Sequence, residues 1–293
     1  MERFKMSPCD FSAGGACSFV PHRSFSDGSD QRDGSAVQVC TTCGIGVTHP
    51  LMDDVASLYA DRSSQDFQQN AVGLARLIKS SVFKRDARRL LSKLEPRPLT
   101  VIDYGCGGGL YTRMMGDFLG AGNVIGVDFH EASPPELSDR PYMSHRALAA
   151  SSVQVDALSA FHVLEHDPDP MALLSRMSSV MKPGAHLVIE VPNIDCVFSH
   201  WVGRKWDAWY LPFHRYYFSC KSLIHLIEAG GFEIEKIEGA CIPSMGRTLA
   251  KIAGRQNTLL FLLAGAALHP FQMLVEKLTG QPSGLRVFAR KRG

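Results

Sequence analysis

The sequence has few of the features that mark several protein classes. It has no long basic run, and its formal net charge is only +2 over 293 residues, so nothing in it indicates a nucleic-acid partner. Residues 1–10 lack the apolar core of a secretory signal, and no internal repeat is evident. The eight cysteines are spread along the chain, and some lie in motifs that need no disulfide. We therefore expect a cytoplasmic protein in a reducing compartment.

One apolar stretch, residues 258–275, is long enough to raise the question of a membrane. His269, Pro270 and Gln272 interrupt it, which argues against a spanning helix. We expect a buried or capping helix pair there, within a helical insertion at about 243–280. A peripheral contact between 258–275 and a membrane surface is the alternative.

Short apolar runs alternate with helical stretches from residue 99 onward. The predicted strands are 99–104, 123–128, 153–161, 185–191, 231–239 and 284–291. The predicted helices between them are 110–119, 170–181 and 219–229. Alternation of this kind predicts an α/β fold with a mostly parallel sheet and helices on both of its faces.

The part before residue 99 has a different character. Residues 1–60 are predicted to form a small cysteine-rich module that needs a metal or the main domain to order it. Residues 61–98 form a helical connection, with a helix at about 66–95. Residues 99–293 then make up the main domain.

The strongest motif is the run Asp103-Tyr104-Gly105-Cys106-Gly107-Gly108-Gly109, which follows a strand and opens a helix. Ligands of open parallel sheets bind at the carboxyl ends of the strands, where glycines let the backbone approach closely. A carboxylate at Asp103 would repel a pyrophosphate but can accept hydrogen bonds from a ligand ammonium group.

This motif resembles the first motif of the class I, Rossmann-like S-adenosylmethionine-dependent methyltransferases. The resemblance implies a three-layer α/β/α domain with a seven-stranded sheet and assigns Gly105, Cys106, Gly107 and Gly109 to the cofactor. About 20 residues on, Asp128 ends a strand, where an acid can bind both ribose hydroxyls. In the family, the residue at Phe129 would pack on the adenine.

The segment from Phe161 to Pro170, FHVLEHDPDP, resembles the stretch that ends the fourth strand in small-molecule methyltransferases, including ubiquinone and glycan enzymes. The resemblance places His162 beside the cofactor sulfonium. His162-x-x-Glu165-His166 also matches an inverted zinc-protease pattern, but that motif needs a helix and this segment follows a strand. At this point of the sequence, some quinone O-methyltransferases carry an acidic residue and then Glu-His, and they bind a divalent ion. His162 replaces the first acid, and metal dependence remains open.

The segment 206–219 resembles one found in methyltransferases of polysaccharide and glycolipid gene sets, and it contains His214. His214 and His166 are the candidate catalytic residues, since an imidazole is suited to removing a hydroxyl proton at neutral pH. His214 can equally be a histidine hydrogen-bonded within its loop. The aromatic residues around it either stack on a sugar or pack in the core. These are Trp201, Trp206, Trp209 and Tyr210.

Cys40-Thr41-Thr42-Cys43-Gly44 has the form of half a zinc knuckle. Its partners would be Cys9 and Cys17, although Ser12 stands where a second CxxC cysteine would fall. A four-ligand structural zinc site and a knuckle that has lost its metal are both open. The same layout resembles several sugar-modifying methyltransferases.

We expect a methyltransferase that transfers a methyl group to a hydroxyl of a small molecule, a sugar or a glycan- or lipid-linked intermediate. One departure from the family is that 144–149 holds no acid near the expected adenine amino group. A degenerate methyltransferase-fold scaffold and a sugar C-methyltransferase are the alternatives.

Overall fold

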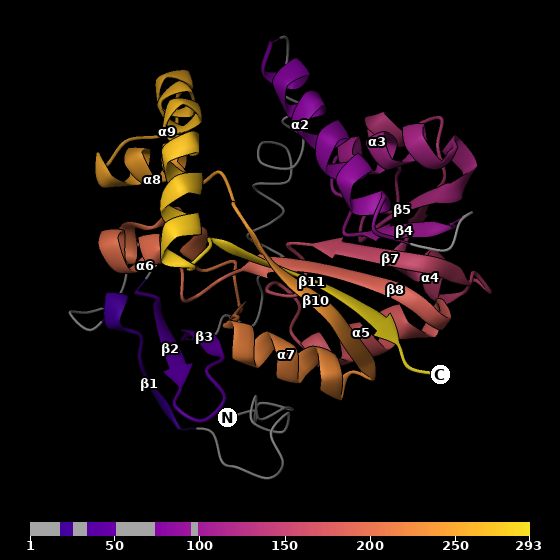
Figure 1. The fold of residues 1–293 in the computed structure, drawn as a ribbon, viewed down its shortest axis with the longest axis horizontal. Helices are drawn as coiled ribbons and strands as arrows, with labels where there is room; N and C mark the ends of the chain where they lie inside the picture. The colour runs from indigo at the N-terminus through magenta and orange to yellow at the C-terminus, as the bar shows by residue number, and fades with distance from the viewer. Residues whose placement is uncertain (1–17, 26–33, 51–73, 95–98) are drawn as a thin grey trace.

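The computed structural model describes residues 18–25, 34–50, 74–94 and 99–293, and in these residues it is built on a seven-stranded sheet (Figure 1). The order across this sheet is β10-β11-β8-β7-β4-β5-β6, and β11 alone runs against its neighbours. The strands are β4 (Val101–Tyr104), β5 (Val124–Asp128), β6 (Tyr142–Ser144), β7 (Val155–Phe161), β8 (Met181–Pro192), β10 (Phe232–Ala240) and β11 (Gly284–Lys291).

The predicted Rossmann-like α/β fold with a seven-stranded, mostly parallel sheet is confirmed. Each of the six apolar runs forms a strand, and no strand end differs from the predicted one by more than four residues. The seventh strand, β6, is three residues long and follows a stretch rich in proline, so no periodic pattern marks it.

Helices cover both faces of the large sheet. One face packs on α2 and α3 through Leu90, Leu91 and Met115, and the other packs on α5 and α7 through residues such as Leu174 and Leu226. The helices are α2 (Leu74–Leu91), α3 (Leu110–Leu119), α4 (His145–Ala149), α5 (Pro170–Ser179), α6 (Val197–Val202), α7 (Cys220–Ala229), α8 (Met245–Ile252) and α9 (Leu259–Thr279).

Local sequence explains where the central helices begin. The Asp169 side chain accepts a hydrogen bond from the Ala172 amide, and Pro170 occupies the first helical position of α5. In α7, the Ser219 and Ser222 side chains each bond the other's backbone amide, which forms a capping box. Both helices therefore begin where a side-chain oxygen accepts a hydrogen bond from an amide of the first helical turn.

A second, four-stranded sheet has the order β1-β2-β3-β9. Its first three strands are β1 (Phe19–Pro21), β2 (Ala36–Cys40) and β3 (Gly46–His49), and β9 (Tyr216–Tyr217) comes from the main domain. Antiparallel pairing aligns Gly46 with Tyr217. The described part of the N-terminal module thus forms one sheet with the segment that carries His214.

The turn between β2 and β3 contains the predicted half-knuckle. Cys40 and Cys43 are both buried, and Gly44 has a φ of +75°, which folds the turn back toward the cysteines. Cys9 and Cys17 lie outside the described residues, so the four-ligand zinc site stays a prediction.

Helix α9 is the one helix among the described residues that is long and apolar enough to cross a membrane by length and composition alone. Only 17% of its most apolar window is buried, so the expectation of a buried helix pair does not hold for it. Its later part does reach the protein body, where His269 and Met273 line a cleft.

Two of the tryptophans near His214 belong to a core. Trp206 and Trp209 are 1% and 0% exposed and pack edge-to-face at 5.3 Å between ring centroids, with Phe25 and Tyr217 against Trp209. Trp201, in contrast, is 62% exposed. The buried pair therefore joins the small sheet to the main domain rather than contacting a sugar.

Replacing Trp209 by alanine should remove most of this packing. We expect Trp209→Ala to lower the free energy of unfolding by about 3–5 kcal/mol, as for large core aromatics. The exposed Trp201→Ala is the matched control and should change it by less than about 0.5 kcal/mol. Urea unfolding followed by circular dichroism measures both, and equal losses would contradict the assignment of Trp209 to the core.

Candidate active site

The glycine loop between β4 and α3 depends on a left-handed backbone. Gly105, Gly107 and Gly109 have φ values of +75°, +51° and +79°. A Cβ at Gly105 would lie 2.4 Å from Val163 Cγ2, and one at Gly109 would lie 2.5 Å from Leu137 Cγ. No other residue type fits these two positions, so the loop keeps its backbone open to the cleft.

Asp103, the next-to-last residue of β4, comes just before this loop and is buried. Its two carboxylate oxygens accept hydrogen bonds from Thr112 Oγ1 at 2.6 Å and from Ser159 Oγ at 3.0 Å. Burial raises the pKa of Asp103 to about 6, although both hydroxyls favour the ionised form. A ligand cation in the cleft would lower this pKa again, which is the behaviour expected of an ammonium site.

Asp128, at the end of β5, is also buried. Its carboxylate accepts hydrogen bonds from the Gly107 and Phe129 amides, both at 2.8 Å. Phe129 is 54% exposed and lies against His130 with ring centroids 3.9 Å apart. Asp128 therefore holds the glycine loop in place, at the point where the next strand of the sheet ends.

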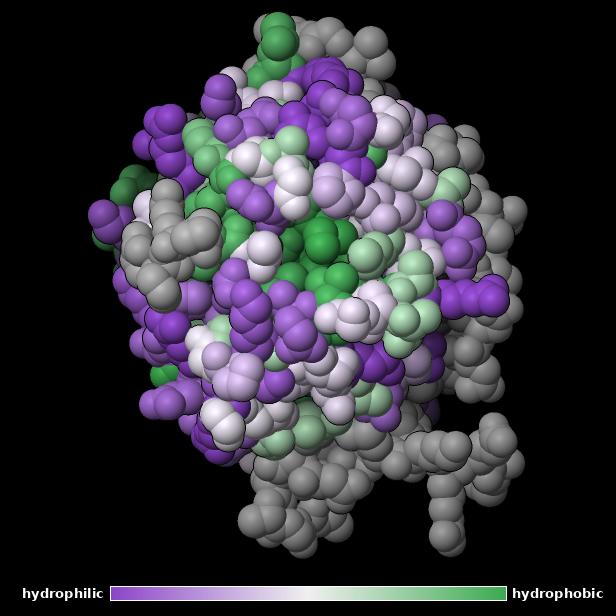
Figure 2. Space-filling model, turned by 90° about the vertical axis from the view of Figure 1, so that its right-hand side faces the viewer, coloured by the Kyte–Doolittle hydropathy of each residue, from purple (hydrophilic) through white to green (hydrophobic). Residues whose placement is uncertain are grey.

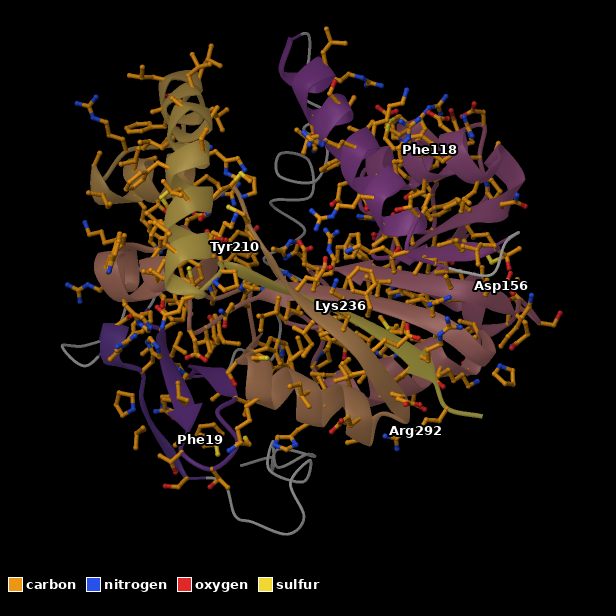
Figure 3. The ribbon with its side chains drawn as sticks, in the orientation of Figure 1. Phe19, Phe118, Asp156, Tyr210, Lys236 and Arg292 are labelled. Carbon is orange, nitrogen blue, oxygen red and sulfur yellow. The ribbon has the colours of Figure 1, made fainter. Side chains whose placement is uncertain are left out.

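A cleft of about 710 Å³ opens at the carboxyl ends of the strands. Asp156, near the start of β7, marks the opposite end of the sheet at the right of Figure 3. The cleft gathers five predicted cofactor residues, namely Asp103, Gly105, Cys106, Gly109 and His162. Gly107, Asp128 and Phe129 adjoin it without lining it.

The two walls of the cleft come from distant parts of the chain. Helix α2 supplies Phe83 and Asp86, and the region after β10 supplies Ile242, His269 and Met273. Figure 1 shows α2 and α9 rising on the same side of the large sheet. One wall is thus formed by the helix before the domain and the other by the helical insertion before the last strand.

His162 stands where β7 ends, with a φ of +57° that is uncommon for a residue with a side chain. Its Nδ1 lies 3.3 Å from Glu165 Oε1, and its Nε2 lies 3.4 Å from Glu190 Oε1. The His162 side chain is 39% exposed at the cleft, and the surrounding protein removes enough water to oppose its protonation. The two carboxylates outweigh this and raise the pKa of His162 to about 10. His162 is therefore a cation in the cleft wall at neutral pH.

The sequence interpretation missed the partners of His162. Glu190 Oε2 accepts a hydrogen bond from Arg286 Nε at 2.6 Å, and the Arg286 guanidinium also contacts Asp86 at 2.9 and 3.1 Å. His162 and Arg286 lower the pKa of Glu190 despite its burial. The sequence did offer a signal, because Glu190 and Arg286 are charged residues within the apolar runs 185–191 and 284–291. A charge buried in a strand needs a partner of opposite sign.

The two predicted catalytic histidines lie together behind Glu165. His214 Nε2 is 3.9 Å from Glu165 Oε1, and the His166 and His214 rings are 4.7 Å apart. His214 and Glu165 are 6% and 1% exposed, and Glu165 Oε2 has no hydrogen-bond partner among the residues that the structure describes. Burial and the neighbouring histidines hold the pKa of His214 well below 6.5, so its imidazole is neutral.

Glu165, His166 and His214 place donor atoms within 4.8 Å of one another. One carboxylate and two imidazoles suit a transition metal better than magnesium, which prefers oxygen ligands. The cationic His162 stands 3.3 Å from Glu165, where the metal-binding relatives described above carry an acid. Its positive charge opposes a second cation, so the group is better suited to moving a proton.

An acidic side chain does lie at the end of β6, although residues 144–149 themselves contain none. Ser144 Oγ donates a hydrogen bond to Glu131 at 2.9 Å. Glu131 follows β5 rather than β6, so spacing along the sequence did not reveal it.

The fold and the glycine loop define a Rossmann-like methyltransferase domain. Residues 78–237 match the family described as "Methyltransferase domain", and the chain belongs to this family. It is 32% identical over 145 residues to a Mycolicibacterium smegmatis protein described as an S-adenosylmethionine-dependent methyltransferase. It is 30% identical over 165 residues to a ubiquinone biosynthesis O-methyltransferase of Xanthomonas axonopodis.

These alignments cover 47% and 50% of this chain, and they span 54% and 68% of the two relatives. Among solved structures, a chain of the Haloferax volcanii complex between the Trm112 methyltransferase activator and a methyltransferase has a TM-score of 0.51 at 15% identity. That match covers 78% of this chain and 98% of the other. A geranyl diphosphate methyltransferase solved with S-adenosylmethionine has a TM-score of 0.50 at 15% identity, covering 77% and 93%. These structures support the fold.

The ion pairs of His162 predict a pH dependence of stability. Because the folded pKa of His162 lies above the ordinary 6.5, its contribution is fully present below pH 6.5 and is lost as the pH rises toward 10. His162→Asn, which tolerates the left-handed backbone, should lower the unfolding free energy by about 0.5–1 kcal/mol at pH 6, since the His162 side chain is 39% exposed and water screens its two ion pairs.

The deficit of His162→Asn should shrink between pH 6.5 and 10 in urea unfolding experiments. His130→Asn, at an exposed position away from Glu165 and Glu190, is the control. A deficit for His162→Asn that stays constant across this range would contradict the assigned charge.

Proposed function

We propose that this protein is an S-adenosylmethionine-dependent O-methyltransferase that acts on a hydroxyl of a small or lipid-linked acceptor. The observation that carries the proposal is the cleft itself, which joins Asp103 and the glycine loop to His162 and its carboxylates. The similarity of this chain to ubiquinone biosynthesis O-methyltransferases supports oxygen as the methylated atom.

The residues at the end of β4 and β5 fit the cofactor. Asp103 would bind its ammonium group, the open backbone at Gly105 and Gly109 would lie against its amino-acid part, and Asp128 would receive the ribose hydroxyls. When bound, the cofactor supplies a methyl group that is already activated by the positive sulfonium. The protein is left with two tasks, which are to align the acceptor and to remove its proton.

We assign proton removal to the His162, Glu165 and His214 group. His162 lines the cleft, where its positive charge stabilises an acceptor oxygen as it loses its proton. Glu165 lies between the two histidines, at 3.3 Å from His162 Nδ1 and 3.9 Å from His214 Nε2. His162 already carries both ring protons, so it takes up no further proton. The proton that leaves the acceptor oxygen is taken up by the neutral imidazole of His214, and Glu165, 3.9 Å away, stabilises the cation formed there.

The cleft wall favours an acceptor with an apolar part. Phe83, Phe161, Ile242, Pro243 and Met273 all line it. A sugar or glycan carried on a lipid and a prenylated ring both combine a hydroxyl with such a part. The scaffold alternative is less favoured, because a decaying site would not be expected to keep Asp103, Asp128, Glu165 and His214 buried together with their contacts.

Calorimetric titration with S-adenosylmethionine tests the cofactor. We expect micromolar binding at pH 7.5 that weakens by about tenfold or more in Asp103→Asn, which keeps the shape of the carboxylate but removes its charge. The exposed Asp139→Asn should bind as the unchanged protein does. If the folded protein does not bind, or if Asp103→Asn binds equally well, the cofactor site is elsewhere.

The base is tested in a methyl-transfer assay with candidate hydroxyl acceptors. His214→Gln should lower kcat by about 10²–10⁴, the usual range for loss of a general base, and leave the calorimetric affinity for the cofactor unchanged. His225→Gln, on α7, is the control and should retain full activity. A normal kcat in His214→Gln would overturn the assignment.

A further inference from the structure

The first half of α9 exposes large apolar side chains on several sides. Leu259, Leu260, Leu262 and Leu263 are 68%, 72%, 50% and 59% exposed. Successive helical residues are rotated by about 100°, so these four point in widely different directions. A helix that is apolar over such a breadth belongs in a hydrophobic surrounding, and within the described residues the protein does not supply one.

The second half of α9 is fixed to the protein. Gln272 and Glu276 are buried, with Gln272 Nε2 donating to the Ile242 carbonyl at 2.8 Å and Glu276 Oε2 accepting from the Ser283 amide at 3.0 Å. The projecting part, 259–268, is therefore about 15 Å long at 1.5 Å per residue. This equals about half of a 30 Å hydrocarbon core, so it fits one leaflet and cannot span.

Helix α8 is held tightly against this projecting part. A Cβ at Gly246 would lie 2.6 Å from the Phe261 carbonyl oxygen, and a Cβ at Gly265 would lie 2.6 Å from the Gly246 amide nitrogen. The backbones of the two helices thus touch through glycines. The two helices therefore form one closely packed unit, and the exposed leucines of α9 form a surface of defined shape.

The exposed charges that the helix pair itself carries are positive, although one of them, Arg247, is paired with Asp207 of the neighbouring segment. Residues 245–279 contain Arg247, Lys251, Arg255 and Lys277, and their one acid, Glu276, is buried. A hollow of about 520 Å³ nearby is lined by Arg23, His200, Arg204 and Lys205 among others. Lys205 Nζ bonds the Ile252 carbonyl at the end of α8 at 3.5 Å, which places this basic hollow beside the pair.

We propose that α8 and α9 dock this protein onto a bilayer surface that carries anionic lipids. The leucines of 259–268 enter one leaflet, and the basic residues of the pair and of the neighbouring hollow lie at the level of the headgroups. The face shown in Figure 2 is largely polar with an apolar area near its centre, and α9 lies toward the opposite side of the molecule, at the left of Figure 1.

Docking onto a membrane would also indicate the class of acceptor, an inference that rests on the proposed function. His269 and Met273, farther along α9, line the cleft. One end of α9 would then lie in the leaflet, and its other end forms part of the cleft wall. The helix would thus place the cleft next to the lipid. The acceptor would then be a hydroxyl on the headgroup of a membrane-anchored lipid.

A second copy of the chain is the other occupant to consider. It would cover one side of α9, whereas the leucines point to several sides, and it would bring two basic surfaces together. The observations therefore favour the bilayer.

Vesicle flotation of the full chain, without cofactor or acceptor, tests the proposal. One set of vesicles is phosphatidylcholine, and the other is an equal mixture of phosphatidylcholine and phosphatidylglycerol. We expect binding to the mixture that falls as salt is raised. Leu260→Glu with Leu263→Glu should weaken it by about tenfold or more, because both side chains leave the hydrocarbon. Val20→Glu, at a 45% exposed position on β1, is the matched control and should bind normally.

Replacing Lys251 and Arg255 by glutamine should weaken binding to the mixture by about fivefold for each charge and leave binding to phosphatidylcholine unchanged. Light scattering of the protein without lipid gives its mass. Absent vesicle binding, equal binding by the leucine variant, or a dimer that the leucine variant dissociates would each overturn the proposal, the last in favour of a second copy. Calorimetric titration of the same variants with S-adenosylmethionine should show unchanged cofactor affinity. A failure of membrane docking can thus be told apart from a failure of the proposed function.

Discussion

A line of alternating charges supports the candidate active site. It runs from Asp86 on α2 to Arg286 on β11, Glu190 on β8, His162 after β7 and Glu165 beyond it, with adjacent partners 2.6 to 3.4 Å apart. Buried carboxylates are stable only with such partners. The line therefore fixes the helix before the domain, the reversed last strand and the loop after β7 relative to one another, and the cofactor cleft lies along it.

Glu165 connects this line to the segment that carries His214. Its backbone carbonyl accepts hydrogen bonds from the Arg215 and Tyr216 amides at 2.8 and 3.1 Å, which holds the His214 segment against the loop after β7. Thr48, on β3, bonds the carbonyl of His214. The orientation of the imidazole is thus determined from three places in the chain: the end of a central strand, the small sheet and the aromatic core around Trp209.

The sequence was sufficient for the parts of the structure that repeat a local pattern. Apolar runs such as 153–161, within which β7 lies, identified the strands, and the glycines after Asp103 identified the loop that only glycine can form. It was insufficient where function depends on pairs distant in sequence. Arg286 and Asp86 are 200 residues apart, and no local periodicity reports their contact. The exposure of α9 was missed for a related reason, since composition alone cannot distinguish a helix that is covered by the protein from one that is not.

The strand β9 sets a limit on where this enzyme can be divided. The family match begins at residue 78, yet Tyr216 and Tyr217 pair with Val47 and Gly46, which precede that boundary. A chain cut at residue 78 would lose the partner strand, expose the edge of β9 and remove Thr48 from the carbonyl of His214. The smallest unit that keeps this sheet intact is therefore larger than the recognisable domain, because the N-terminal hairpin supports the segment of His214, the residue that we propose as the base.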